Sequence, residues 1–205
     1  MSARSEVRER IRGLYGIADA GTSDDDPVGL GVAYLDGGCR LLQLRCKGWT
    51  SDERLRAARD LLPRCRAVGA TLIVNDDAEV AAAADADGLH VGQSDGEVAA
   101  LRRVIGPDRI LGRSTGALEE LLAAEADYLA FGPVFETVHR SAPAPARGLD
   151  HLRRARLLVT VPLVAIGGIG PANVEQVRSR GADSWAVIGA VALADDRLAA
   201  VRSLL

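Results

Sequence analysis

The sequence predicts an α/β protein that forms a single (β/α)8 TIM barrel over residues 1–205, with residues 1–12 as an N-terminal extension. Short apolar runs alternate with Ala-, Arg- and Glu-rich stretches from end to end, as expected for parallel strands buried on both faces. The alternation repeats eight times in about the length that a compact barrel needs. Hydrophobic residues make up 48% of the chain and aromatic residues 3%, so Ala, Val, Leu and Ile must build the core.

The predicted strands are apolar runs of four or five residues. They span residues 14–18, 41–45, 71–74, 88–91, 109–112, 128–131, 163–166 and 184–188. An open doubly wound sheet is the alternative, but no GxGxxG motif follows the first run, and eight regular right-handed units favour closure.

Capping residues mark the helices between these strands. Ser51 or Asp52 caps one helix and Gly69 ends it. Asp76 or Asp77 opens the next helix, and Pro171 lies at the start of the helix after the seventh strand, where its missing N–H costs nothing. The other predicted helices span residues 28–37, 96–105, 117–126, 150–158 and 190–205.

Composition excludes several classes of protein. The net charge of −3 gives no support for a nucleic-acid-binding surface. Cys39, Cys46 and Cys65 have no metal-site spacing and cannot all pair, which favours a reducing cytoplasm. The charged N-terminus has no apolar leader, and no run is long enough to span a membrane. We expect small phosphorylated molecules as partners, with a homodimer as the alternative to a monomer.

A long, charged loop follows the sixth strand, within the stretch LAFGPVFETVHRSAPAPARG (129–148). It carries Thr137, His139, Arg140 and Arg147, and long loops of this kind are either functional or disordered. We interpret it as a cover over an anionic ligand, with Arg140 and Arg147 as clamps. The alternative is a Pro/Ala-rich surface excursion with solvated arginines.

Cations follow the second strand at the carboxyl end, where barrels of this kind carry their sites. Strand alternation points Gln43, Arg45 and Lys47 to one side, and two cations with an amide suit a phosphate or diphosphate. A solvated strand end is the alternative. However, an arginine that points into a small barrel needs an anion to offset its burial.

Carboxylates follow the next two strands. Asn75 and Asp76 end the third strand and Asp95 follows the fourth, so Asp76 and Asp95 together can hold Mg2+. Asp76 can also serve as a helix cap. We expect His90 to be a histidine of the barrel core whose ring nitrogens have hydrogen-bond partners. Ser114 either donates to a phosphate oxygen or caps the following helix.

Glycines follow the last two strands, in Ile166-Gly167-Gly168-Ile169-Gly170 and in Ile188-Gly189. In this architecture, glycines after the seventh and eighth strands let backbone N–H groups approach a phosphate. Two tight turns are the alternative. The sequence therefore predicts two anion sites on one face of the barrel.

The combined motifs QLRCK (43–47), IVNDD (73–77), GLHVGQSD (88–95), GRST (112–115), GPVFETVHR (132–140), AIGGI (165–169) and VIGA (187–190) resemble a known family. It is the family of thiamine phosphate synthase and the related TenI-like thiazole tautomerase. The resemblance covers nearly the whole chain, from Leu14 to Val191.

The resemblance implies a transferase of thiamine biosynthesis. Such an enzyme joins hydroxymethylpyrimidine diphosphate to thiazole phosphate and gives thiamine phosphate and diphosphate. It also implies Mg2+ on Asp76 and Asp95, and catalytic roles for Arg45, Lys47 and Arg140. The pyrimidine diphosphate site would comprise Gln43, Arg45, Lys47, Asn75, Ser114 and Arg140. The thiazole phosphate site would comprise Thr137, His139, Gly168, Ile188 and Gly189.

The chain departs from the synthase pattern at four positions. Synthases usually have Glu at Cys46, Thr at His139, Lys at Arg140 and Ser at Gly189. The FETVHR…ARGL loop is closer to the tautomerase branch, but no histidine follows the serine of the fifth strand, on which that branch depends. The alternatives are therefore a thiazole tautomerase and a non-catalytic binder of phosphorylated thiamine precursors.

Overall fold

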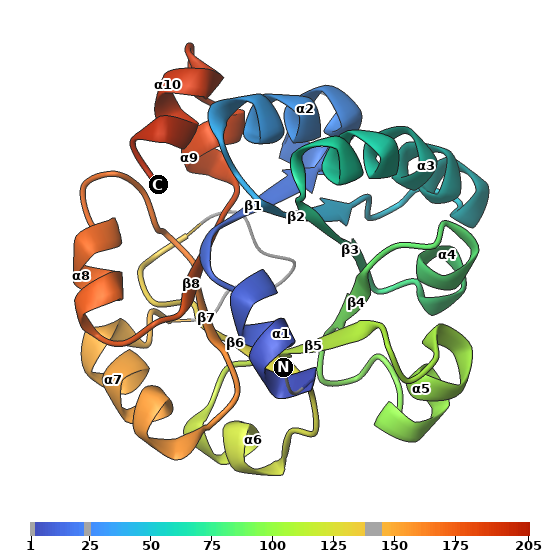
Figure 1. Ribbon diagram of the computed structural model, residues 1–205. Helices are drawn as coiled ribbons and strands as arrows, with labels where there is room; N and C mark the ends of the chain where they lie inside the picture. The colour runs from blue at the N-terminus through green and yellow to red at the C-terminus, as the bar shows by residue number, and fades with distance from the viewer. Residues whose placement is uncertain (1–2, 23–25, 138–144) are drawn as a thin grey trace.

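The computed structural model describes residues 3–22, 26–137 and 145–205. Eight parallel strands form a closed barrel in the order of the sequence, each strand hydrogen-bonded to the next and β8 to β1 (Figure 1). The predicted fold class is therefore confirmed. The strands are β1 (Gly13–Asp19), β2 (Leu41–Arg45), β3 (Thr71–Asn75), β4 (Gly88–Val91), β5 (Ile110–Thr115), β6 (Tyr128–Phe131), β7 (Leu163–Ile166) and β8 (Ser184–Val187).

Helices surround the barrel, as Figure 1 shows. They are α1 (Ala3–Arg10), α2 (Pro27–Gly37), α3 (Ser51–Val68), α4 (Ala78–Ala83), α5 (Val98–Ile105), α6 (Leu118–Ala123), α7 (Gly148–Leu158), α8 (Val174–Ser179), α9 (Gly189–Ala192) and α10 (Arg197–Arg202). A short 3-10 turn (Ala20–Thr22) follows β1.

Several predicted helix ends are wrong by a few residues. The N-cap of α3 is Thr50 rather than Ser51 or Asp52, because Thr50 and Glu53 form a reciprocal capping box. The helix after β7 begins at Val174, three residues beyond Pro171. The single closing helix predicted for residues 190–205 is two helices, because Asp196 caps a separate α10 by accepting from Ala199 N at 2.9 Å.

Two apolar clusters hold the barrel together. One fills the inside of the barrel and includes Tyr15, Ile73, Tyr128 and Val164. The other, larger cluster lies between the strands and the surrounding helices. Tyr34 of α2 belongs to the larger cluster and lies so close to Gly16 of β1 that any side chain at Gly16 would collide with its ring. Small residues in the strands thus let the helices approach the barrel closely.

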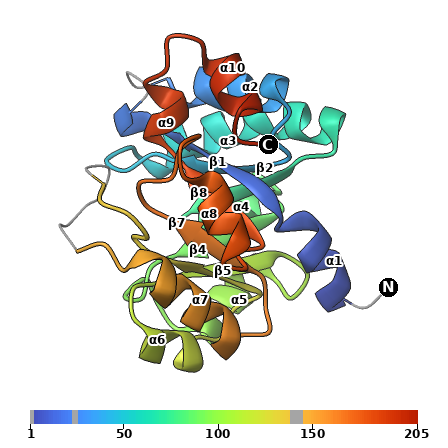
Figure 2. The ribbon, with the colours of Figure 1, turned by 90° about the vertical axis from the view of Figure 1, so that its left-hand side faces the viewer.

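Helix α1 covers the amino end of the barrel, and Figure 2 shows it projecting there. Its Val7 packs against the inner cluster, and Ile11 just after it is fully buried. Arg10 forms an ion pair with Asp87 and donates to Thr71 Oγ1 at 3.2 Å. The N-terminal extension therefore closes the end of the barrel opposite the carboxyl ends of the strands.

An Ala-Asp pair precedes three of the strands and fastens each to the strand before it. Asp87, Asp127 and Asp183 accept hydrogen bonds from the backbone N–H groups of β3, β5 and β7 at 2.7–2.8 Å. Each carboxylate also pairs with an arginine: Arg10, Arg102 and Arg156 respectively. The arrangement satisfies buried backbone donors at the amino end of the barrel.

Among the residues that the structure describes, no helix has the length and apolar character needed to cross a membrane.

Candidate active site

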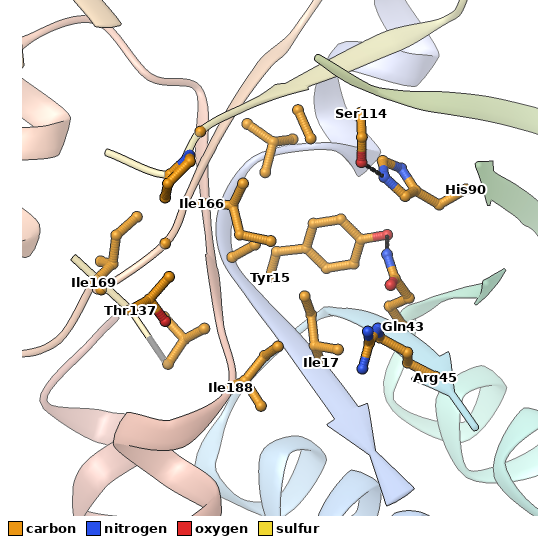
Figure 3. Close-up of a pocket in the computed structure, with 18 of the residues that line it drawn as sticks. Tyr15, Ile17, Gln43, Arg45, His90, Ser114, Thr137, Ile166, Ile169 and Ile188 are labelled. Atoms are coloured by element: carbon orange, nitrogen blue, oxygen red, sulfur yellow. Dashed lines mark hydrogen bonds between the residues drawn. The ribbon is translucent and has the colours of Figure 1, made fainter. Parts of the chain in front are cut away.

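A cavity of about 1110 Å³ opens at the carboxyl ends of the strands, and Figure 3 shows part of its lining. Every predicted site residue that the structure describes lines this one cavity. These residues are Gln43, Arg45, Lys47, Asn75, Asp76, Asp95, Ser114, Thr137, Gly168, Ile188 and Gly189. His139 and Arg140 lie outside the described residues. Arg147 also lines the cavity.

Arg45 extends from the end of β2 and forms an ion pair with Asp19 at the end of β1. The arginine side chain is 20% exposed and the aspartate side chain 8%, so the pair is largely desolvated. A guanidinium this buried needs an anion beside it, and Asp19 supplies one. Asp19 therefore fixes the direction in which Arg45 faces the cavity.

The two aspartates after β3 have different roles. Asp77 is the N-cap of α4, because it accepts from Val80 N at 3.0 Å, and it pairs with Arg54. Asp76 has a positive φ of 64°, a conformation that aspartate tolerates better than most residues. Its backbone N–H donates to His90 O at 2.9 Å. Asp76 is thus turned into the cavity, where Lys47 Nζ lies 3.8 Å from its carboxylate.

Asp76 and Asp95 face each other closely enough to interact. Burial raises the pKa of Asp76, and the negative charge of Asp95 raises it further. Asp95 is oriented by Gly92, whose backbone N–H donates to its carboxylate at 2.6 Å. Two carboxylates that repel each other at the wall of an anion-binding cavity are a suitable donor set for a divalent cation.

Arg113 fastens the loop that carries Asp95. Its Nη2 donates to Gln93 O at 3.1 Å and to Gly96 O at 2.8 Å, on either side of the aspartate. The described residues contain no group of three or more His, Cys, Asp or Glu side chains arranged as a metal cage. A cation at Asp76 and Asp95 would therefore need further oxygen ligands from substrate or water.

Glycines form the opposite rim, after β7. Gly167 and Gly168 have positive φ values of 100° and 65°. A Cβ on Gly168 would lie 2.7 Å from Phe135 Cβ and closer still to the carbonyl oxygen of Glu136. Only glycine fits there, and the backbone is left open to the cavity. Gly189 begins α9 on the next strand connection and lines the same cavity.

His90 lies at the base of the cavity with both ring nitrogens occupied. Nδ1 is 2.8 Å from the hydroxyl of Tyr128, and Nε2 is 2.8 Å from Ser114 Oγ. Burial lowers the pKa of His90 to about 4, so the ring is neutral at pH 7. His90 is therefore a histidine of the barrel core with both ring nitrogens hydrogen-bonded, as expected. Ser114 lies within β5 and does not cap α6, and the backbone N–H groups of Gly116 and Ala117, just before α6, donate to the Glu120 carboxylate.

Sequence reasoning missed Asp19 and Tyr15, which both line or support the site. Asp19 is the last residue of β1, so the rule that selected Arg45 and Asp76 at strand ends would also have selected Asp19. Tyr15 lies deeper in the same strand, and Figure 3 shows its ring among Ile17, Ile166 and Ile188. Cys46 is 4% exposed and packs in the outer cluster.

A cavity of this kind, at the carboxyl ends of a closed parallel barrel with glycines after the seventh and eighth strands, defines an enzyme class. It is the class of (β/α)8 barrels that act on phosphorylated small molecules.

Within that class, the chain belongs to the thiamine monophosphate synthase family, whose sequence model matches residues 14–191. It is 43% identical to a thiamine-phosphate synthase of Methanocella arvoryzae over 195 residues, which is 93% of this chain and 92% of that protein. A thiamine-phosphate synthase of Chloroflexus aurantiacus is 44% identical, over 93% of this chain and 90% of the relative.

Solved structures agree with this assignment. A thiamine phosphate pyrophosphorylase from Pyrococcus furiosus superimposes with a TM-score of 0.88 at 35% identity, covering 97% of this chain and 95% of that one. A second one, from Bacteroides thetaiotaomicron, has a TM-score of 0.68 at 14% identity, over 95% of each chain, and shows the shared fold alone.

Proposed function

We propose that this protein is a thiamine phosphate synthase. It joins hydroxymethylpyrimidine diphosphate to thiazole phosphate and releases diphosphate. The observation that carries the proposal is the gathering of Arg45, Asp76, Asp95 and Gly168 around one cavity. Four separate strand ends contribute these residues, so a single cavity can hold two phosphorylated molecules side by side. Membership of the family supports the same reaction.

The chemistry suits these residue types. When the C–O bond to diphosphate breaks, negative charge develops on the leaving group, and cations placed beside it lower the barrier. Arg45 and Lys47 lie on the side of the cavity where Asn75 and Ser114 can donate further hydrogen bonds. The thiazole nitrogen needs no base to attack, so its placement is the protein's main contribution to bond formation.

Apolar side chains form the middle of the cavity, between the two polar ends. Ile17, Ile166 and Ile188 surround Tyr15 in Figure 3. This lining would keep water from the pyrimidine cation that forms when diphosphate leaves. Thr137 and Arg147 line the cavity on either side of the segment that contains His139 and Arg140, whose roles at the two phosphate sites remain predictions.

Asp76 and Asp95 would hold Mg2+, and their mutual repulsion fits that role. A bound Mg2+ would neutralise part of the charge on the diphosphate. Lys47, 3.8 Å from Asp76, would then be drawn toward the phosphate oxygens rather than toward the carboxylate. Asp19 keeps Arg45 in place whether or not a cation is bound, because the two side chains are already paired.

The tautomerase alternative has less support at this site. That branch relies on a histidine after the serine of the fifth strand, and here Thr115 and Gly116 occupy the place. In the described part of the cavity wall the histidine present is His90, and both of its nitrogens already bind protein groups. It is therefore poorly suited to move a substrate proton.

The test is a diphosphate-release assay with each substrate alone and with both together, with and without Mg2+. The synthase proposal predicts release only when both substrates and Mg2+ are present. Turnover of a thiazole alone without metal would identify a tautomerase. A rise in melting temperature with ligand, but no product, would identify a binder.

We also propose a cytoplasmic location. Cys39, Cys46 and Cys65 are all buried free thiols, which suits a reducing compartment. The homodimer stays a prediction, to be checked by sedimentation equilibrium.

A further inference from the structure

Five polar side chains form one continuous hydrogen-bonded chain across the inside of the barrel. Gln43 Nε2 donates to the Tyr15 hydroxyl at 2.9 Å, and the Tyr15 and Tyr128 hydroxyls lie 2.9 Å apart. Tyr128 then meets His90 Nδ1 at 2.8 Å, and His90 Nε2 meets Ser114 Oγ at 2.8 Å. Figure 3 shows the first and last of these bonds.

Both ends of this chain line the cavity, and so do Tyr15 and His90, whereas Tyr128 does not. Gln43 and Ser114 both lie in the cavity wall, on β2 and β5. Tyr128 is fully buried and Tyr15 is 1% exposed. The Tyr128 ring also stacks on His90, with ring centroids 5.4 Å apart. Five different strands thus contribute one member each, and the chain runs along the base of the cavity.

The direction of the chain follows from the chemistry of its members. Burial raises the pKa of both tyrosines, so both hydroxyls keep their protons at pH 7, and each ring nitrogen of His90 lies against a hydroxyl group. The Tyr15 hydroxyl oxygen accepts a hydrogen bond from the Gln43 amide, so the Tyr15 O–H is left to donate to Tyr128. Tyr128 in turn donates to His90 Nδ1, which leaves the ring proton on Nε2, directed at Ser114 Oγ.

We propose that this chain sets the hydrogen-bonding roles of Gln43 and Ser114 together, with Tyr15, Tyr128 and His90 as positioning residues. Gln43 presents its carbonyl oxygen to an N–H donor of the pyrimidine, and Ser114 presents its hydroxyl proton to a phosphate oxygen. This inference rests on the proposed function, because it assigns the two groups to a pyrimidine that carries a diphosphate.

The alternative direction shows why the two ends are coupled. If the Gln43 amide turned over, its oxygen would accept from Tyr15, and every proton in the chain would shift by one link. Ser114 would then donate to His90 and would offer the ligand an acceptor instead of a donor. A buried chain permits no mixed arrangement without leaving a polar group unpaired. The direction of the hydrogen-bonded chain therefore determines both how Gln43 binds the pyrimidine and how Ser114 binds the phosphate.

The first test reads the direction of the chain without enzyme activity. The chain has 3 histidines, so 15N NMR of histidine-labelled protein at pH 7 can identify His90 by its loss in His90→Gln. The expected signal is a neutral ring protonated on Nε2, with mixed tautomers in Tyr128→Phe. A ring protonated on Nδ1, or a charged ring, in the wild-type protein would overturn the proposed direction.

The second test measures the coupling between the ends through kcat/KM for the pyrimidine diphosphate. Gln43→Ala and Ser114→Ala are made singly and together. In the wild-type background, the combined loss is expected to be about tenfold smaller than the product of the single losses, the size of one broken hydrogen bond. In the Tyr128→Phe background the losses are expected to multiply to within threefold.

Tyr34→Phe is the matched control. Tyr34 is also fully buried and its hydroxyl donates to Val187 O at 2.8 Å, but it lies outside the chain. It should lower the melting temperature about as much as Tyr128→Phe and leave the tenfold coupling intact. If Tyr128→Phe does not fold, Tyr15→Phe breaks the chain one link closer to Gln43 and should abolish the coupling in the same way.

The outcomes separate this inference from the proposed function. The inference would be overturned if the coupling were equal in the wild-type and Tyr128→Phe backgrounds, or if it were absent from both. The proposed function would still stand in either case, provided that the wild-type enzyme released diphosphate. If the wild-type protein released no diphosphate, the proposed function would fail, and the NMR experiment would still decide the direction of the chain.

Discussion

Gly168→Ala tests whether the glycine rim after β7 is shaped for a phosphate. Gly168 has a φ of 65°, and alanine in this left-handed region costs about 1–2 kcal/mol. The new Cβ would also lie 2.7 Å from Phe135 Cβ, whereas ordinary contact begins near 3.4 Å. The contact with Phe135 alone requires the two to separate by 3.4 − 2.7 = 0.7 Å, and the closer carbonyl oxygen of Glu136 requires residues 135–136 and the rim to move apart by more than that.

Both effects can be measured. A loss of about 2 kcal/mol in a chain of this length lowers the melting temperature by roughly 4–8 °C. A shift of this size at a binding site can reduce the rate about 100-fold, so kcat/KM for thiazole phosphate should fall on that scale. The KM for the pyrimidine diphosphate should change little, because its predicted ligands that the structure describes lie on β2, β3 and β5 or directly after β2.

Gly170→Ala is the matched control in the same connection. Among the described residues its Cβ would meet only Ala190 Cβ, at 3.6 Å, and Gly170 does not have a positive φ. It should lower the melting temperature by less than about 2 °C, since neither strain nor a collision arises. If Gly168→Ala matched Gly170→Ala in both stability and thiazole kinetics, the rim would not be the phosphate site.

Three further predictions concern the cations, the amino end and the buried histidine. Arg45→Ala should reduce diphosphate release by about 100-fold or more in the steady-state assay, and a rate within threefold of wild type would remove Arg45 from the mechanism. Asp127→Ala should lower the free energy of unfolding by about 2 kcal/mol in urea titration, since Leu111 N and Arg102 both lose their partner, whereas Glu9→Ala, in an exposed pair, should change it little. The folded-state pKa of His90, about 4, lies below the unfolded value of 6.5. The unfolded chain therefore takes up the proton first, and stability should fall by up to about 3 kcal/mol as the pH drops from 6.5 to 4, a slope that His90→Gln should flatten.

The architecture was predictable because buried parallel strands and their helices leave a strong pattern. Eight apolar runs gave eight strands in the expected order. Helix ends were harder, since a cap depends on which of several neighbouring polar side chains turns back onto the helix. Thr50 rather than Ser51 does so before α3, and Asp77 rather than Asp76 before α4. Because Asp77 caps α4, the Asp76 side chain faces Asp95 instead.

The candidate site was predictable where its residues end strands, because parallel strands bring their carboxyl ends together. What the sequence did not show was pairing between strands. The ion pair of Arg45 with Asp19 joins β1 to β2, and the contact of Tyr128 with His90 joins β6 to β4, on either side of β5. Such pairs depend on the register and diameter of the closed sheet, which no single run of residues encodes.

The most direct measurement of the central claim is to quantify both products in one reaction mixture that contains the two substrates and Mg2+. If the cavity holds both phosphorylated molecules, thiamine phosphate and diphosphate should appear in equal amounts and at the same rate. Diphosphate without thiamine phosphate would mean that the pyrimidine cation is lost to water. The absence of both products would contradict the account of a shared cavity that joins them.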